Sequence, residues 1–559
     1  MFDIGVIPSS QGCGGFAMDV ASNERIDHFG IVAGMIKDLG LVEFIDKRVG
    51  TDSDERITTG EAVAGMIING LGFTDRPLSL VPQFFEECPV ETLFRPGVQA
   101  EDFNRFKLGR ALDNLHAHNS SALFAEFALH VCQQEGIQTR FAHLDTTSFS
   151  LTGDYLPDAT EGVVKIVQGH SKDLRPDLKQ VVLELIVTPD GGIPLMAKVF
   201  DGNASDNNVF KARSKELVDK IRDGTGFEVL YADCKLYSES NAENLKEHPF
   251  VTRIPENIKL TQEKITESIA GPQTAWVQYD DGRKYRIFEV DHYGISQRWI
   301  VVHSNAAHER AKQQIAKKTA KEREAIDKEI FHLQATRFDC ADDARKELTK
   351  RVKKWRYHKL ETSEVVMHDH FTTKGRPKAG ATPDRNTYQI TATASVNQVA
   401  VEKDKEEGAC FVLGTNTLSE KMPAISIIEG YAQQQTVERG FRFLKEPVFF
   451  TSSLFVKKAS RIEGLLMVMT LALLVYAVAE RRLRRALKAA GATIPNQIKK
   501  PTATPTLRWV FQLFYGVNRL CMKINGDIKY IWTGITALRE KILRCLGEKI
   551  LSIYQISWE

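Results

Sequence analysis

The sequence predicts an α/β protein in which a helical N-terminal domain precedes a strand-containing core, and a strand-rich insertion interrupts that core. Three observations lead to this prediction. Apolar residues recur with helical spacing over residues 1–115. Runs rich in β-branched and aromatic residues cover much of 141–232, and they return at 251–305 and 386–416. A strongly charged stretch with helical spacing, 308–360, separates the last two strand-rich runs.

The N-terminal domain, residues 1–115, is the acidic part of a chain whose formal net charge is +2 over 559 residues. It carries 10 Lys and Arg against 18 Asp and Glu, a net charge of −8. Thr58 or Thr59 is expected to cap a helix that has Glu61 in its first turn. Small apolar helices of this kind form either a DNA-reading module or an oligomerisation module. The negative charge argues against broad phosphate binding.

The first part of the core is predicted over residues 116–240. The run TPDGG, 188–192, lies between two apolar runs and is a hairpin signal. In chain order the expected elements are strands over 141–151, 180–187 and 193–200, a helix over 206–223 and a strand over 227–232. Three strands, a helix and a further strand form the opening order of a ribonuclease-H-like α/β core.

The insertion is predicted over residues 241–425, with the charged helices of 308–360 inside it. Residues 305–360 carry 16 Lys and Arg against 9 Asp and Glu, a net charge of +7. Such helices form either a solvated scaffold or a surface that contacts nucleic-acid phosphates.

The second part of the core is expected over residues 426–480, and basic C-terminal helices are expected over 481–559. The apolar run 464–479 has 16 residues, fewer than the roughly 17–25 that cross a bilayer, so a buried core helix over 462–479 is expected. In the C-terminal region 15 Lys and Arg stand against 4 Asp and Glu, a net charge of +11 that could engage a polyanion.

The cysteines and the N-terminal residues indicate a cellular compartment. The eight cysteines are scattered without a C-x-x-C pair, which predicts neither a disulfide framework nor a zinc site and fits a reducing cytoplasm. Residues 1–15 lack the charged and long apolar regions of a secretory signal. We therefore expect a cytoplasmic protein with no membrane partner.

The run YAQQQTVERGFRFLK, residues 431–445, predicts a helix with one carboxylate on a polar and basic stripe. At about 100° per residue, most of the stripe falls within about 60° of helix surface. Its members are Tyr431, Gln434, Glu438, Lys445 and, on the same face, Arg442. Val437, Phe441 and Leu444 form a neighbouring apolar stripe that would pack on a core. Taken alone, the pattern also fits an ordinary amphipathic surface helix with solvated charges.

Two further acids stand where a sheet could bring them to Glu438. Asp145 lies in the strand HLDTT, and Asp233 ends the strand VLYAD. The carboxyl ends of strands line the ligand crevice of an open α/β sheet, and a helix packed across that edge can add a third carboxylate. Converging acids repel one another unless a cation is bound. Mg²⁺ prefers oxygen ligands, and two such ions about 3.5–4 Å apart can support in-line displacement at phosphorus.

Other acids lie nearby in the sequence and compete for this role. They are Asp154, Asp158, Asp201 and Asp206. Asp201 is expected to cap a loop and Asp206 to cap a helix. A lone Asp after a strand is more often a turn or cap residue. The combination of three acids in this element order favours a catalytic site.

The run 431–445 resembles the Y-R-E-K signature of DDE transposases from bacterial insertion sequences. Tyr431, Glu438 and Lys445 match the spacing of its Tyr, catalytic Glu and Lys, whereas Gln434 stands at the Arg position. Further segments that resemble the family are 169–187, which follows the first Asp, 231–241 around the second Asp, and the helical segment 28–46, typical of the long-chain IS-sixteen-thirty-four-type subgroup. The resemblance spans about residues 25–480.

The resemblance implies that Asp145, Asp233 and Glu438 are both the catalytic residues and the ligands of two Mg²⁺ ions, for which Mn²⁺ could substitute. The residues that it implies for positioning DNA are Tyr431, Gln434, Arg442 and Lys445. Since Gln434 has no charge, Arg442 is expected to compensate for the missing Arg.

The function implied is that of an insertion-sequence transposase in a bacterial or archaeal cytoplasm, associated with the nucleoid. Its partners would be double-stranded DNA, as terminal inverted repeats and as target, and a second copy of the chain, since two element ends must be held together. One alternative is a catalytically inactive, transposase-derived DNA-binding protein, against which the intact acids argue. Another is a ribonuclease-H-like nuclease that hydrolyses DNA without joining strands.

Overall fold

The structure is a computed structural model of the 559-residue chain. The residues that it describes are 18–73, 77–153, 155, 162–171, 175–204, 228–234, 237–241, 246, 248–372, 375–376, 380–446, 456–524 and 527–556. The chain divides into two compact units, the first made of Met1–Phe250 and Glu429–Glu559 and the second of Val251–Ile428. The sequence placed the corresponding boundaries at 240/241 and 425/426.

Helices fill the N-terminal part of the first unit, as the sequence predicted. A reciprocal pair of hydrogen bonds caps α3: Thr58 Oγ1 accepts from Glu61 N at 3.1 Å, and Glu61 Oε2 accepts from Thr58 N at 2.8 Å. The helices are α1 (Phe29–Asp38), α2 (Leu41–Val49), α3 (Thr59–Leu71), α4 (Val81–Phe85), α5 (Val90–Leu93), α6 (Arg105–Ala117) and α7 (Ser120–Gln134).

Four strands lie side by side in the first unit, in the order β4-β3-β2-β5. They are β2 (Phe141–Leu151), β3 (Lys179–Val187), β4 (Pro194–Phe200) and β5 (Val229–Ala232). β2, β3 and β4 are antiparallel neighbours, with the expected hairpin at 188–192, whereas β5 runs parallel to β2. The helix expected over 206–223 lies outside the described residues.

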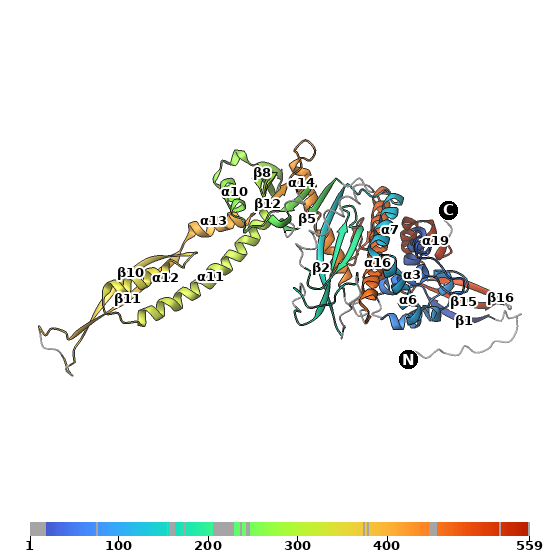
Figure 1. The fold of residues 1–559 in the computed structure, drawn as a ribbon, viewed down its shortest axis with the longest axis horizontal. Coiled ribbons are helices and arrows are strands. Elements are labelled where there is room, and N and C mark those ends of the chain that lie inside the picture. Colours follow the sequence, from blue (N-terminus) through green and yellow to red (C-terminus); the bar gives the residue numbers. More distant parts are fainter. Residues whose placement is uncertain are drawn as a thin grey trace. The chain divides into compact units, whose positions relative to one another are not determined.

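The apolar helix of the second core segment is longer than predicted, since α16 runs without a break over Ala459–Ala489. It lies between the strands and the N-terminal helices of the first unit (Figure 1). Among the described helices, α16 is the one long and apolar enough to cross a bilayer, and 89% of its most apolar window is buried inside the protein. This burial agrees with the predicted core helix.

The C-terminal region contains a β-hairpin where the sequence predicted only basic helices. Its strands, β15 (Asn518–Ile524) and β16 (Asp527–Thr533), are antiparallel, and β15 also pairs with β1 (Met18–Arg25). The prediction was wrong because the partner strand comes from the opposite end of the chain, which no local pattern reveals. The remaining elements there are the short strands β13 (Ile494–Pro495) and β14 (Pro501–Thr502) and the helices α17 (Leu507–Leu513), α18 (Ala537–Leu546) and α19 (Glu548–Ile553).

Ion pairs join the basic C-terminal region to the N-terminal helices and β1. Arg482 Nη1 lies 2.7 Å from Asp38 Oδ2, and the same guanidinium contacts Glu135. Arg519 Nε donates to Glu24 Oε2 at 2.6 Å. The opposite net charges of the two ends of the chain are therefore partly neutralised within the first unit.

The second unit contains five strands in the order β6-β12-β9-β8-β7, and the pairs β6/β12, β12/β9, β9/β8 and β8/β7 are antiparallel. They are β6 (Phe250–Arg253), β7 (Val277–Asp280), β8 (Arg283–His292), β9 (Ile295–Ser304) and β12 (Cys410–Thr415). Two helices accompany them, α10 (Lys259–Ala270) and α13 (Gln398–Gly408). The sequence predicted neither helix, because it assigned strand character to the runs 251–305 and 386–416 that contain them.

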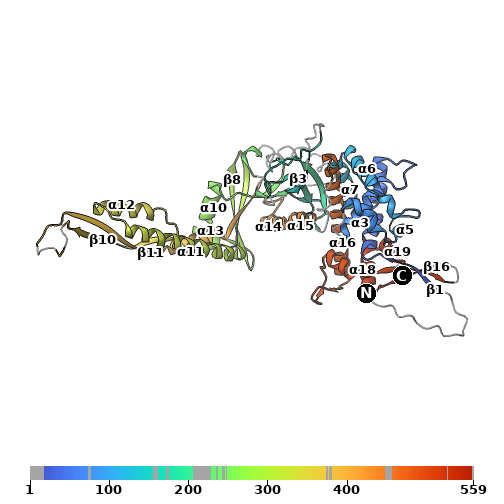
Figure 2. The same cartoon turned by 90° about the horizontal axis from the view of Figure 1, so that it is seen from below.

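The rest of the second unit is an arm built from two helices and a two-stranded ribbon (Figure 2). Its elements are α11 (Asn305–Ala335), α12 (Ala341–Val352), β10 (His358–His370) and β11 (Arg385–Val396). Leu333 of α11, Leu348 of α12 and Ile390 of β11 share one small buried cluster. The charged stretch of the sequence is therefore a pair of helices that pack on the ribbon through a narrow apolar side.

Candidate active site

Two of the predicted acids lie next to each other on neighbouring parallel strands. Leu144 of β2 pairs with Ala232 of β5. The next residues are Asp145, still within β2, and Asp233, the first residue after β5, so their main chains leave this pair at the same level, where the strands are about 4.8 Å apart. Residues at matched positions of a parallel pair point to the same face of the sheet. Both side chains are partly exposed.

The alternation of side chains along β2 defines the face on which Asp145 lies. His143, Asp145, Thr147 and Phe149 share this face. Leu185 of β3 pairs with Asp145 and lies on the same face.

The helix α15 (Gln435–Leu444) lies along this face and runs in the direction of β2. Next to its first residue, Gln434 Oε1 lies 2.8 Å from His143 Nδ1, and Gln434 Nε2 donates to the carbonyl of Leu144 at 3.0 Å. Beyond its last residue, Lys445 Nζ lies 5.7 Å from the centroid of the Phe149 ring. The start of α15 therefore lies near His143 and its end near Phe149, so the helix runs alongside β2 in the same direction.

The apolar side of α15 makes its contact with the sheet and with α16. Val437, Phe441 and Leu444 are between 0% and 6% exposed, which confirms the predicted apolar stripe. Gly440 allows a close approach, because a Cβ at this position would lie 3.3 Å from a methyl of Leu185 and 3.3 Å from a methyl of Leu473.

This packing brings Glu438 level with Asp145. Glu438 lies one turn after Gln434 on the same side of α15, about 6 Å further along the helix axis. Asp145 lies two residues after His143, about 7 Å along β2. Gln434 is hydrogen-bonded to His143. Glu438 and Asp145 therefore lie at nearly equal distances beyond this hydrogen bond, Glu438 along α15 and Asp145 along β2. Asp145, Asp233 and the exposed Glu438 are thus brought to one face of the sheet.

His143 is a neighbour of the acids that sequence analysis missed. Its side chain is buried, and burial lowers its pKa to about 4, so the ring is neutral at neutral pH. Since Gln434 Nε2 donates to Leu144, Gln434 Oε1 is the acceptor and His143 Nδ1 carries the proton. The alternation in HLDTT, which puts His143 on the face of Asp145, is the signal that could have identified it.

The side chain of Gln434 is engaged within the protein, which differs from its expected use as a contact to DNA. Both polar atoms of its amide have partners on β2, and one amide hydrogen remains for a further acceptor. With the proton on Nδ1, His143 requires an acceptor, which the Gln434 amide supplies and an Arg side chain lacks. The departure from the family pattern at this position therefore has a local physical reason.

The run 431–445, for which the sequence predicted one helix, is divided between two helices in the structure. A tight turn at 433–434 separates α14 (Ala424–Ala432) from α15. Across this turn Gln434 N donates to Tyr431 O at 3.0 Å, an i to i+3 hydrogen bond. Such bonds advance the chain by about 120° per residue instead of 100°. Three such steps make one full turn, so Tyr431, which is partly buried, lies on the same side of this turn as Gln434.

The two cations of the stripe follow Glu438 along α15. Arg442 is exposed and lies one turn after Glu438, on the same side of the helix. Lys445 is the C-terminal cap residue, and its ammonium lies over Phe149 at a distance typical of a cation–π contact.

The three acids form a donor set that suits a hard divalent cation. Their ligand atoms are all carboxylate oxygens, which Mg²⁺ and Mn²⁺ prefer. Thr146 N donates to Asp145 Oδ1 at 2.7 Å and orients that carboxylate. A cation among the acids would also remove their mutual repulsion. The residues present therefore supply the type of ligand atom that such an ion prefers, although these three acids are not among the described groups whose ligand atoms all lie within 4.8 Å of one another.

The competing acid Asp201 has the structural role that the sequence predicted. Its Oδ1 accepts from Lys165 N at 2.8 Å, and its carbonyl accepts from Ala204 N at 2.9 Å, so it caps a loop. Asp154, Asp158 and Asp206 lie outside the described residues.

Comparison with known families shows the family to which the chain belongs. The profile of the transposase DDE domain matches residues 144–475, more than half of the chain. The chain belongs to the DDE transposase family. The match contains all three acids of the site, and the family in general uses divalent metal ions, in agreement with the donor set of this transposase.

Other comparisons add less. A domain of unknown function, DUF4277, matches residues 21–129, which contain the N-terminal helices of the transposase. No curated protein matches the chain. The chain is similar to the cryo-EM structure of the piggyBac transposase synaptic complex with hairpin DNA, with 8% identity, a TM-score of 0.34, and coverage of 88% of this chain and 82% of that chain. A likeness at this level carries no argument about the site.

Proposed function

We propose that this protein is an insertion-sequence transposase that cuts DNA at the ends of its element and joins those ends to target DNA. The observation that carries the proposal is the placement of Asp145, Asp233 and Glu438 on one face of the sheet. The strand arrangement supports a ribonuclease-H-like core, because three antiparallel strands are followed by a fourth that runs parallel to the first.

Asp145, Asp233 and Glu438 are proposed to bind two Mg²⁺ ions, with Mn²⁺ as a substitute. Bound ions of this kind activate the attacking oxygen and stabilise the leaving oxygen in a displacement at phosphorus. Two of the ligands come from adjacent strands, which fixes their spacing. The third comes from α15, so its position depends on the hydrogen bonds between Gln434 and β2.

The proposed reaction has two displacements at phosphorus. In the first, water attacks the phosphodiester at the element end, and the bond between phosphorus and the 3′-oxygen of the element breaks. The element strand keeps a 3′-hydroxyl and the flanking strand a 5′-phosphate. In the second, that 3′-hydroxyl attacks a target phosphodiester, a new bond to phosphorus forms, and a target 3′-hydroxyl leaves.

The DNA partners are proposed to be the terminal inverted repeats and the target duplex. Tyr431, Arg442 and Lys445 are proposed to position the DNA backbone beside the acids, and Gln434 is proposed to act chiefly by positioning α15. Two element ends require two active sites, which supports a homodimer. We expect the protein to act on the nucleoid in a bacterial or archaeal cytoplasm, without a membrane partner.

The decisive experiment compares Glu438→Gln with the parent in a strand cleavage and joining assay that contains Mg²⁺ and DNA carrying the element ends. The variant should bind DNA as the parent does but cleave at least about a hundredfold more slowly, because one metal ligand is lost. Asp201→Asn is a matched control, since it removes a nearby carboxylate whose role is to cap a loop, and it should keep parental activity.

Three outcomes would contradict the proposal. Parental activity in Glu438→Gln would show that the acids are wrongly assigned. Cleavage by the parent without joining would favour a ribonuclease-H-like nuclease. DNA binding by the parent without any cleavage would favour a transposase-derived DNA-binding protein.

A further inference from the structure

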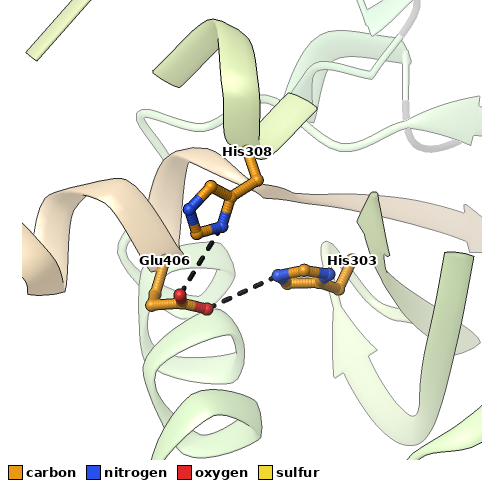
Figure 3. Close-up of side chains that lie close together, drawn as sticks. All are labelled: His303, His308 and Glu406. Carbon is orange, nitrogen blue, oxygen red and sulfur yellow. Dashed lines mark ion pairs between the residues drawn. The ribbon is translucent and has the colours of Figure 1, made fainter. Parts of the chain in front are cut away.

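A second group of metal-ligating side chains lies in the second unit, whereas the three acids belong to the first. His303 lies near the end of β9, His308 in the first turn of α11, and Glu406 in the last turn of α13. One ligand atom from each of these residues lies within 4.8 Å of the others. Figure 3 shows that both imidazole rings face the same carboxylate.

The separations of the ligand atoms suit a shared cation better than direct hydrogen bonds. His303 Nε2 lies 3.4 Å from Glu406 Oε2, and His308 Nδ1 lies 3.5 Å from Glu406 Oε1. Good N–H···O hydrogen bonds are shorter, about 2.7–3.2 Å. A tetrahedral zinc ion with bonds of about 2.0–2.1 Å places neighbouring ligand atoms roughly 3.4 Å apart. The two separations between the histidines and Glu406 are therefore close to the distance between neighbouring ligand atoms of a tetrahedral ion.

Backbone contacts fix the three elements that carry these ligands. Ser304 N donates to Ala409 O at 3.0 Å, which ties the end of β9 to the end of α13. Gly408 lets α13 approach α11 closely, because a Cβ at this position would lie 2.9 Å from Ala311 Cβ. The ligands are thus held together before any ion binds, which lowers the cost of binding.

The surroundings of His303 are consistent with a ligand. Lys284 of β8 pairs with His303 of β9. The charge of Lys284 disfavours a cation, but its ammonium lies 5.0 Å from the Trp276 ring centroid and donates to Gln273 at 3.1 Å. Cys410 pairs with His303 across the strands.

We propose that His303, His308 and Glu406 bind one zinc-class divalent cation, with water completing a tetrahedral shell. Imidazole ligands select zinc and its d-block neighbours over Mg²⁺, which prefers an all-oxygen shell. The ion links β9, α11 and α13 where the arm begins, and so stabilises the base of the arm. Cysteine spacing did not reveal this site because its ligands are two histidines and a distant Glu. The proposal is independent of the proposed function.

The test is a zinc titration of the full chain carrying Glu438→Gln, which removes one ligand of the proposed magnesium site. Zn²⁺ competes against a chromophoric chelator, and Co²⁺ replaces Zn²⁺ for visible spectroscopy. We expect one zinc ion per chain and the d–d absorption of tetrahedral cobalt. His308→Ala and Glu406→Gln should each weaken zinc binding more than about tenfold, because each removes a ligand. Hydrogen exchange at the start of α11 should slow when zinc is added.

Two matched controls should bind zinc as the parent does. His332→Ala removes an exposed histidine from the same helix, and Cys410→Ser removes the thiol that lies opposite His303. The proposal is overturned if the chain that carries Glu438→Gln alone binds no zinc. It is also overturned if both ligand variants bind zinc with the same affinity as that chain. Circular dichroism checks the fold of each variant. If His308→Ala does not fold, the nearly isosteric Glu406→Gln still decides. No readout uses DNA, so failure here is distinct from failure of the transposase proposal.

Discussion

Gln434 connects the helix that carries Glu438 to the strand that carries Asp145 through both polar atoms of its amide. Its oxygen accepts from Nδ1 of the buried His143, and its Nε2 donates to the main-chain carbonyl of Leu144. A buried donor that loses its partner costs about 1–3 kcal/mol, more than a typical hydrogen bond contributes. The position of Glu438 and the stability of the core therefore depend on the same side chain.

We expect Gln434→Ala to lower the free energy of unfolding by about 1–3 kcal/mol, because His143 Nδ1–H would be left buried without an acceptor. Strand cleavage should fall as well, since α15 would lose its anchor beside Asp145. Urea unfolding measures the first effect, and the cleavage assay in Mg²⁺ measures the second. Gln433→Ala, an exposed amide one residue earlier, is the control. Equal stability of the two variants would contradict the anchoring role.

At the scale of elements, local patterns predicted what depends on neighbours in sequence. The strands at 141–151, 180–187 and 193–200 and the apolar side of α15 follow from the spacing of apolar residues, and the structure confirms them. The turn at 433–434 was missed because the helical spacing of apolar residues continues through it. It depends on the contact of Gln434 with β2, which brings together residues far apart in the chain.

The same distinction holds for the candidate site. The three acids were predicted from strand ends and motif spacing, and the parallel register of β2 and β5 explains why two of them meet. The buried His143, the capture of Gln434 by β2 and the cluster around Glu406 could not be predicted, because each requires a contact between elements that no local pattern specifies.

The arm offers a prediction for an element with a small core. Leu333 of α11 is 1% exposed in a cluster shared with α12 and β11. Leu333→Ala should destabilise the arm locally by about 2–4 kcal/mol, because a cavity would remain in a cluster with few other contacts. Hydrogen exchange of α11, α12 and the ribbon should accelerate, while the strands of the second unit keep their protection.

The control for this prediction is Phe331→Ala on the same helix. Phe331 is 69% exposed, so its removal deletes a larger apolar side chain without leaving a cavity. Exchange in the arm should be unchanged in this variant. If Leu333→Ala accelerated exchange throughout the second unit, the arm would not be a separate cooperative element.

At the scale of the whole molecule, ion pairs between the acidic N-terminal part and the basic C-terminal part of the chain stabilise the fold. Cations that form these pairs are not free to bind nucleic acid. Arg482 and Arg519 of the basic C-terminal region pair with acids of α1 and β1 and with Glu135, which follows α7. The net charge of +11 that the sequence assigns to this region therefore overstates the cations that face a polyanion. The salt dependence of DNA binding should reflect only cations that contact phosphate, because each such contact releases counterions.

The pH dependence of stability is a property of the whole fold, because buried groups in several elements contribute with opposite signs. Burial lowers the pKa of His28 and of His143 from 6.5 to about 4. Between these values the unfolded chain binds more protons than the folded one, so both groups lower the free energy of unfolding as the pH falls. Burial raises the pKa of Asp27, Asp46 and Glu463, and these acids act in the opposite direction.

The buried acids contribute equally to the parent and to His143→Asn. The difference between the unfolding free energies of these two proteins therefore reports the histidine alone. Between pH 6.5 and pH 4 the free energy of unfolding of the parent should fall by about 3 kcal/mol more than that of His143→Asn, since a pKa shift is worth about 1.4 kcal/mol per unit. Above about pH 7.5 the difference in unfolding free energy should be constant, because the histidine is then neutral in both states. His28→Asn should behave in the same way, because His28 is also buried and its Nε2 donates to the carbonyl of Leu71 at 2.8 Å. His130→Asn, at an exposed position on α7, should follow the parent at every pH. Urea unfolding at fixed pH values measures all four proteins, and parallel curves for the parent and His143→Asn would show that His143 is not held neutral by its burial.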